Sequence, residues 1–232
     1  MPKHIGIVAC SAEGASLCYR TICVEGPKLL GGHAHPEVTM HTPSLGATME
    51  RIYAGDWQGV GEIMLAQAKK LAAIGADFLI CPDNTIHQAL PYVLPRSPLP
   101  WLHIAEVVAA EAVACGLKCL GLTGTKWLVA GPVYPEKLEA KSLAYLRPSD
   151  PECEEINRII MEELCRSVFT ADGIAYFQGV IGGLKTRGAD AVVLACTEIP
   201  LIIDDTNSPL PTLDSTRLLA RAAFRRAVES AS

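Results

Sequence analysis

Two side chains that can donate and accept protons occupy matching positions in this sequence. Asp83 and Cys196 each lie eight residues after the glycine of a Gly-Ala-Asp tripeptide, at Gly75 and Gly188. Each ends a run of apolar residues and is followed by polar ones. Brought together, one group can remove a proton from a carbon atom while the other returns a proton to the opposite face. That is the chemistry of racemisation or epimerisation.

Each residue also has a simple structural interpretation. Asp83 follows a proline and precedes Asn84-Thr85, a pattern typical of a helix N-cap. A cysteine at the end of a strand is usually a small, buried hydrophobic residue. The matching positions favour the catalytic interpretation of the pair. The hydroxyl and amide groups that follow can bind a carboxylate or an enolate, helped by the N-termini of the next helices.

The tripeptides belong to a longer internal repeat. Three pairs of segments match in order, at separations of 115 residues (Lys3 to Lys118), 113 residues (Gly75 to Gly188) and 111 residues (Ser97 to Ser208). Recurrent turn chemistry explains one such match but not three in register. We infer a duplication in which each copy has the size of a small domain.

Both copies alternate short apolar runs with amphipathic segments. The pattern predicts buried parallel strands at residues 5–9, 38–41, 78–81, 120–123 and 192–195. It predicts helices at residues 60–74, 104–115, 154–169 and 215–228. The expected fold class is α/β, with two pseudo-symmetric lobes that are each a parallel sheet flanked by helices. Ligands of such sheets bind beyond the carboxyl ends of the strands, so we expect the active site in the cleft between the lobes.

The two Ser-Pro-Leu-Pro segments are candidate crossings between the lobes, because prolines stiffen a chain and resist helix formation. On this basis we expect a first lobe of residues 1–97 with 212–232 and a second lobe of residues 98–211.

Composition excludes several classes of protein. The chain has 232 residues, of which 50% are hydrophobic and 19% charged, and its formal net charge is −5. An acidic chain without a long Lys/Arg cluster is not expected to bind nucleic acid. We expect no membrane partner, because no run of about 18 apolar residues occurs. The strand-like N-terminus does not resemble a signal peptide.

The nine cysteines are odd in number and form no Cys-x-x-Cys pair. Free thiols in a reducing cytoplasm are therefore expected, and we predict a cytoplasmic protein. No metal site is predicted, because neither Cys115 with Cys119 nor His33 with His35 has a matching second pair of ligands.

Several motifs together resemble the aspartate/glutamate racemase family, which includes hydantoin racemases, maleate isomerases and arylmalonate decarboxylases. The resemblance covers nearly the whole chain and rests on Ile5-Gly-Ile-Val, Cys81-Pro-Asp-Asn-Thr-Ile-His87, Gly121-Leu-Thr-Gly-Thr125, Ile160-Met-Glu-Glu-Leu-Cys165 and Ala195-Cys-Thr-Glu-Ile199. It implies two pseudo-symmetric lobes, a small carboxylate or amino acid as substrate, no cofactor, and a homodimer.

The resemblance also implies roles for single residues. Cys196 is the expected acid/base group on one face of an α-carbon, with Asp83 on the other. The expected carboxylate-binding residues are Ser11, Asn84, Thr85, Thr123, Thr125 and Thr197. Glu198 and His87 are expected to position the acid/base groups. Turn capping and hydrogen bonding within the core explain these polar residues equally well.

One departure from the family concerns Asp83, because the two-cysteine racemases have cysteine before Asn-Thr. Cys81 lies two positions earlier, about 7 Å back along the same face of a strand. An ordinary aspartate is a poor base for a carbon acid, so we expect burial to raise the pKa of Asp83. Leu164-Cys165 stands where aspartate racemases have a lysine, and an aspartate substrate is therefore not favoured.

These features lead to three functional hypotheses. The first is a cofactor-independent amino-acid racemase that uses Cys196 and Asp83. The second is a cofactor-free decarboxylase, or a cis-trans isomerase of a small dicarboxylate, that uses Cys196 alone. The third is a carboxylate-binding protein without catalysis, against which the intact Cys-Thr-Glu motif argues.

Overall fold

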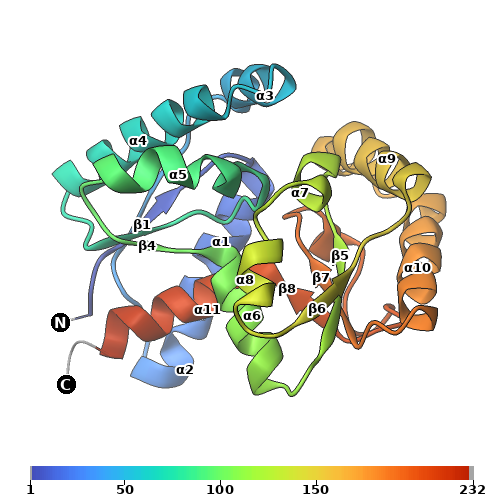
Figure 1. The fold of residues 1–232 in the computed structure, drawn as a ribbon. Helices are drawn as coiled ribbons and strands as arrows, with labels where there is room; N and C mark the ends of the chain where they lie inside the picture. The colour runs from blue at the N-terminus through green and yellow to red at the C-terminus, as the bar shows by residue number, and fades with distance from the viewer. Residues whose placement is uncertain (1, 230–232) are drawn as a thin grey trace. The chain divides into compact units, whose positions relative to one another are not determined.

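The computed structural model describes residues 2–229, which form two compact units (Figure 1). The first lobe comprises the chain up to Ile104 together with the residues from Thr216 onward, and the second lobe comprises Ala105–Ser215. Each lobe is a four-stranded parallel sheet flanked by helices. This confirms the predicted α/β class with two lobes.

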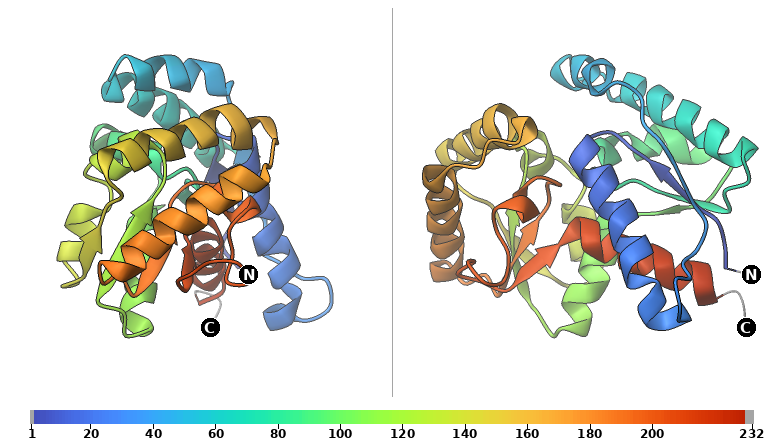
Figure 2. Two further views of the ribbon diagram at one scale, coloured as in Figure 1. Left: turned by 90° about the vertical axis from the view of Figure 1, so that its right-hand side faces the viewer. Right: turned by 180° about the vertical axis from the view of Figure 1, so that it is seen from behind.

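The first lobe has the strand order β2-β1-β3-β4. Its strands are β1 (Ile5–Val8), β2 (Val38–His41), β3 (Phe78–Ile80) and β4 (Trp101–Leu102). Its helices are α1 (Ala12–Glu25), α2 (Pro27–Leu30), α3 (Leu45–Tyr53), α4 (Trp57–Ala73), α5 (Leu90–Val93) and α11 (Ser215–Val228). Figures 1 and 2 show α4 and α5 on one face of the sheet, and α1 and α11 on the other.

The second lobe has the order β6-β5-β7-β8, which repeats the order of the first. Its strands are β5 (Cys119–Thr123), β6 (Ala144–Leu146), β7 (Ala191–Leu194) and β8 (Thr212–Asp214). Its helices are α6 (Ile104–Ala114), α7 (Lys126–Ala130), α8 (Pro135–Glu139), α9 (Asp150–Arg158) and α10 (Ala171–Thr186). Helix α10 covers the opposite face of the sheet from α6 (Figure 1).

The Gly-Ala-Asp repeat has the same structural task in both lobes. Gly75 and Gly188 have φ angles of 94° and 101°, which only glycine adopts without strain. The Asp77 carboxylate accepts a hydrogen bond of 2.7 Å from the N–H one residue before β1. The Asp190 carboxylate accepts one of the same length from the N–H one residue before β5. Each aspartate thus ties the start of one strand to the start of its neighbour.

A second shared feature is the close approach of a helix to the central strand. A Cβ atom added to Gly6 of β1 would lie 3.4 Å from the Cβ of Leu71 in α4. One added to Gly121 of β5 would lie 3.4 Å from the Cβ of Leu184 in α10. The matching helix–strand packing within each lobe therefore supports the duplication inferred from the sequence.

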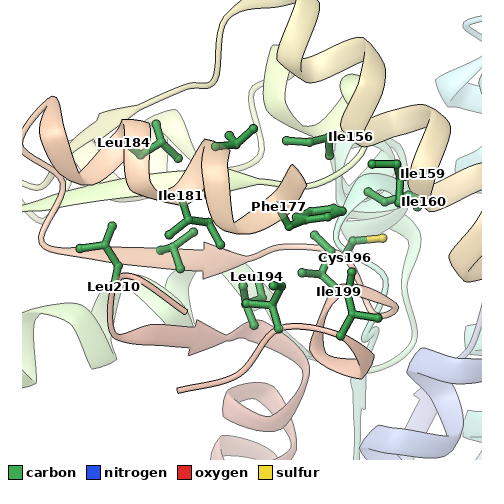
Figure 3. Packing of buried hydrophobic residues seen from close by; sticks show 14 of the residues in the cluster. Ile156, Ile159, Ile160, Phe177, Ile181, Leu184, Leu194, Cys196, Ile199 and Leu210 are labelled. Atoms are coloured by element: carbon green, nitrogen blue, oxygen red, sulfur yellow. The ribbon is translucent and has the colours of Figure 1, made fainter. Parts of the chain in front are cut away.

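The core of the second lobe lies between β7 and the helices α9 and α10. Figure 3 shows Phe177 and Ile181 of α10 packed toward Leu194 of β7, with Cys196 at the end of this cluster. Phe177 is fully buried, and Cys196 is 9% exposed. The apolar core thus extends to the sulfur atom that the sequence predicts to be catalytic.

The helix predicted at residues 154–169 is not continuous, and this expectation was wrong. Helix α9 ends at Arg158, and the chain continues as one wider π-helical turn over Ile159–Glu163. The Glu163 carboxylate pairs with Arg158 at 2.9 Å and accepts a hydrogen bond of 2.8 Å from Thr170, which holds the wide turn. Ser167, in the left-handed region at φ 57°, then ends the helical path.

Within residues 2–229, no helix has both the length and the apolar composition that crossing a membrane requires.

We predict that Gly6→Ala destabilises the protein by about 1–3 kcal/mol, the usual cost of overpacking a core. The new methyl group would lie 2.7 Å from Leu79 Cδ2 and 3.1 Å from Ala76 Cβ. Urea denaturation measures the change. Gly46→Ala is the matched control, because its methyl group would have only Ser44 Oγ nearby, at 3.6 Å. An equal loss of stability in both variants would contradict the packing argument.

Candidate active site

In the first lobe, Asp83 lies just beyond the carboxyl end of β3. Its half-buried carboxylate accepts hydrogen bonds from the backbone N–H groups of Cys10 (3.2 Å) and Ser11 (3.2 and 3.3 Å). These donors follow β1, the neighbouring strand, so the parallel sheet brings them to the same edge. Hydrogen bonds from backbone N–H groups stabilise the negative charge of a carboxylate. The contacts therefore favour an ionised Asp83.

His87 holds the backbone of Asp83. Its Nδ1 lies 2.9 Å from the Asp83 carbonyl oxygen, and its Nε2 lies 3.3 Å from the backbone N of Ile104. The carbonyl can only accept and the backbone N–H can only donate, so the imidazole is neutral with its proton on Nδ1. His103, just after β4, packs edge-on against this ring at 4.8 Å between centroids. His87 thus has the contacts expected of a positioning residue.

Cys81 is fully buried, with its Sγ 3.7 Å from the carbonyl oxygen of Asp83. Burial raises the pKa of this thiol well above its ordinary value, and the charge of Asp83 raises it further. Cys81 is therefore a neutral thiol at neutral pH. Of the two candidates before Asn-Thr, Asp83 is the more exposed.

Three other predicted residues of the first lobe lie near Asp83. Ser11 contacts its carboxylate, and Asn84 and Thr85 follow it in the sequence. The Ser11 hydroxyl accepts a hydrogen bond from the N–H of Gly14 and caps α1. Asn84 is 2% exposed, whereas Thr85 is half-buried at the start of a 3₁₀ turn. The Ser11 hydroxyl thus caps α1, and the Ser11 backbone N–H binds the Asp83 carboxylate.

In the second lobe, Cys196 lies just beyond the carboxyl end of β7, and its thiol contacts a carboxylate. Cys196 Sγ lies 3.0 Å from Glu198 Oε2, which also accepts a hydrogen bond of 2.7 Å from the Thr197 hydroxyl. Thr197 and Glu198 are 2% and 3% exposed. The three consecutive residues form one buried network of a thiol, a hydroxyl and a carboxylate.

This environment keeps the Cys196 thiol protonated. Burial raises its pKa well above the ordinary value, and the charge of Glu198 together with the hydrogen bond to it raises the pKa further. The resting Cys196 side chain is therefore a neutral thiol that can donate a proton.

The two predicted threonines at the carboxyl end of β5 make local contacts. The Thr123 hydroxyl, fully buried, donates to the carbonyl of Val193 in β7 at 2.8 Å. Thr125 caps α7 by accepting from the N–H of Leu128 at 3.3 Å. Thr123 is the last residue of β5 and Thr125 follows it, beside β7, the strand that Cys196 follows.

Sequence reasoning missed three features of these sites. The first is the backbone N–H of Cys10, which any residue type could supply. The second is His103, which follows β4. At the repeat separation of 111 residues, His103 corresponds to Asp214 at the end of β8. The third is the exposed Cys165, which lies close enough to Cys196 to raise its pKa slightly.

Among the described residues, no group of three or more His, Cys, Asp or Glu side chains is arranged to hold a metal ion.

Comparisons with known proteins agree with this geometry. The sequence profile of the Asp/Glu/hydantoin racemase family matches residues 10–223. The chain belongs to this family. It is similar to the broad specificity amino-acid racemase RacX of Bacillus subtilis, with 25% identity over 158 residues. That match covers 67% of this chain and 66% of the relative, just under two thirds of its length.

Two solved structures resemble this chain over almost its whole length. One, from Yersinia pestis and provisionally described as an Asp/Glu racemase, has a TM-score of 0.89 and 28% identity, and covers 97% of this chain and 99% of the other. An aspartate racemase homologue from Pyrococcus horikoshii has a TM-score of 0.83 and 27% identity, and covers 98% of this chain and 99% of the other. The similarity thus extends over both lobes.

We predict that Glu198→Gln lowers the pKa of Cys196, because the variant loses the negative charge that disfavours the thiolate. Alkylation by iodoacetamide, followed at Cys196 by mass spectrometry across a pH series, should then begin at lower pH than in the unmodified protein. Burial remains, so the pKa should stay above that of a free cysteine. The control is Glu154→Gln, at an exposed glutamate of α9. An unchanged or raised alkylation midpoint in Glu198→Gln would contradict the role of Glu198.

Proposed function

We propose that this protein is a cofactor-independent amino-acid racemase in which Cys196 and Asp83 act on opposite faces of the α-carbon. The observation that carries the proposal is the buried Cys196–Glu198 contact, a protonated thiol with an acceptor 3.0 Å away. Asp83 lies at the equivalent place in the other lobe, after the third strand of an identical strand order. Membership of the racemase family supports the same reaction.

The contacts suggest which protonation state begins the cycle. Asp83 is stabilised as a carboxylate and Cys196 as a thiol. In this state Asp83 accepts the α-proton of one enantiomer, and the electron pair of the C–H bond stays on the substrate as an enolate. Cys196 then gives its proton to the opposite face. The products are the other enantiomer, a protonated Asp83 and a Cys196 thiolate.

The reverse reaction begins from the less stable state, with Cys196 as thiolate and Asp83 protonated. The two enantiomers should therefore turn over at different maximal rates, although the equilibrium constant of a racemisation is one. In that direction the Cys196 thiolate accepts the α-proton and the protonated Asp83 gives its proton to the opposite face of the enolate, which restores the starting state of both groups. The proposed carboxylate-binding residues remain the six expected from the sequence: Ser11, Asn84, Thr85, Thr123, Thr125 and Thr197.

One observation favours the alternative that uses Cys196 alone. The Asp83 carboxylate is held by the backbone N–H groups of two residues, an arrangement that would equally suit a structural role. A decarboxylase or cis-trans isomerase needs only one proton donor, and Cys196 has the protonation state for it. The same assay distinguishes the two, because a one-base protein exchanges or donates a proton without inverting the carbon.

The first test is incubation with single enantiomers of amino acids in D₂O, followed by NMR for α-deuterium and by optical rotation. We predict inversion with deuterium incorporation, and a loss of at least about a hundredfold in turnover for Cys196→Ser. Turnover equal to the unmodified protein in Cys196→Ser would refute the catalytic assignment. Release of CO₂ from a substituted malonate without racemisation would favour the alternative.

A second variant tests Asp83. Asp83→Asn preserves the shape of the side chain but cannot accept the α-proton, and we predict a loss of racemisation of at least about a hundredfold. Cys81→Ala is the matched control, because its thiol is fully buried and outside the proposed chemistry. If Asp83→Asn abolishes inversion but keeps deuterium exchange, then Cys196 works alone on one face. If Cys81→Ala is the more damaging change, the first-lobe assignment is wrong.

A further inference from the structure

A cavity of about 470 Å³ opens between α7, the end of β6 and the first turns of α9 in the second lobe. Its walls comprise Lys126 and Trp127 of α7, Arg147 after β6, and Asp150, Cys153 and Glu154 of α9, with Ala130 at one side. Small-molecule sites in proteins commonly have volumes of about 300–1,000 Å³. None of these residues takes part in the proposed chemistry.

The charges of this α7–α9 pocket are balanced. Lys126 Nζ lies 3.0 Å from Glu154, and Arg147 lies 3.7 Å from Asp150, too far for a hydrogen bond. All four side chains are between 40% and 95% exposed. Exposed ion pairs contribute little to stability, so a ligand can replace them at small cost.

The less polar surface of the pocket comes from two other residues. Trp127 is half-buried, and Lys126 Nζ lies 5.7 Å from the centroid of its ring, in range of a cation–π contact. Cys153 is 6% exposed, and its thiol points to the carbonyl oxygen of Pro148 at 3.5 Å. Trp127 and Cys153 thus add an aromatic ring and a buried thiol to the charged lining of the pocket.

We propose that the α7–α9 pocket binds a free α-amino acid with an apolar or aromatic side chain. Two cations and two anions match a ligand that carries one charge of each sign, whereas an anion such as a nucleotide would meet two carboxylates. The planar guanidinium of Arg147 suits the α-carboxylate, because it can donate two parallel hydrogen bonds. Glu154 and Asp150 suit the α-ammonium group, and Trp127 suits the side chain.

This pocket is separate from the catalytic group of the same lobe. In the strand order β6-β5-β7-β8, Arg147 follows β6 whereas Cys196 follows β7, with β5 between them. Yet α7 begins directly after Thr125, and the backbone N–H of Lys126 donates to Asn157 of α9 at 3.2 Å. An amino acid in the pocket would therefore contact the helix that Thr125 caps. The inference goes beyond the proposed function, because it adds a second, non-catalytic amino-acid site.

The test uses L-phenylalanine and two analogues that each lack one charge, 3-phenylpropionate and 2-phenylethylamine. Binding is followed by isothermal titration calorimetry and by the tryptophan fluorescence that Trp127→Phe removes. We expect saturable binding of L-phenylalanine, and at least about tenfold weaker binding of both analogues, since each loses a charge-assisted contact. Arg147→Gln should weaken binding by a similar factor. Arg20→Gln, the same change at an exposed arginine of the first lobe, should leave it unchanged.

Two results would overturn the proposal. One is binding of the analogues, or of L-phenylalanine to Arg147→Gln, with unchanged affinity. The other is loss of the Trp127 signal in Cys196→Ser, which would mean that the ligand occupies the catalytic site. Failure of racemisation with every amino acid, while L-phenylalanine still binds the α7–α9 pocket, would refute the proposed function and leave this inference intact.

Discussion

The proposed chemistry depends on one buried contact, in which the Cys196 thiol lies 3.0 Å from the Glu198 carboxylate. Two neighbouring acids in a buried site do not both ionise readily, because each charge opposes the other. Glu198 also accepts a hydrogen bond from the Thr197 hydroxyl, and the burial of Cys196 together with the charge of Glu198 keeps the proton on sulfur. The second lobe therefore supplies an acid at rest. Any reaction that starts by removing a proton from carbon must begin with a base from elsewhere, and this requirement gives Asp83 its importance.

The two lobes share a framework but not the groups at its end. Strand order, the Gly-Ala-Asp turns and the close approach of a helix to the central strand are the same in both. The turns after β1 and β5 differ. The first donates backbone N–H groups to Asp83, whereas in the second the Thr123 hydroxyl donates to the neighbouring strand. Duplication thus fixes where two groups lie in their sheets, and the residues after each strand decide their chemistry.

The sequence was sufficient to predict the long central strands and the main helices, because continuous apolar runs and 3.6-residue periodicity are strong signals. It did not predict β4, β6 and β8, because these short strands are only partly buried, whereas the equally short β3 is fully buried and apolar. The π-helical turn at Ile159–Glu163 was also missed, because its cause is a contact between Glu163 and Thr170 rather than a local preference. Ser11 was predicted for its hydroxyl. Its backbone N–H is what contacts Asp83, and no side-chain pattern reveals that.

The contacts of Asp83 and Cys196 have a joint consequence for a two-base reaction. In the proposed reaction each group starts with the charge that its contacts favour, which is ionised for Asp83 and neutral for Cys196. One turnover of that reaction would reverse both charges. A protonated Asp83 is a weaker acceptor for the N–H groups of Cys10 and Ser11. The hydrogen bonds that join the residues after β1 to the residue after β3 would therefore be weaker. The Cys196 thiolate then lies 3.0 Å from Glu198, whose charge disfavours it. In the proposed reaction, the state left after one turnover is therefore disfavoured in both lobes, and proton exchange with water would return both groups to their starting charges.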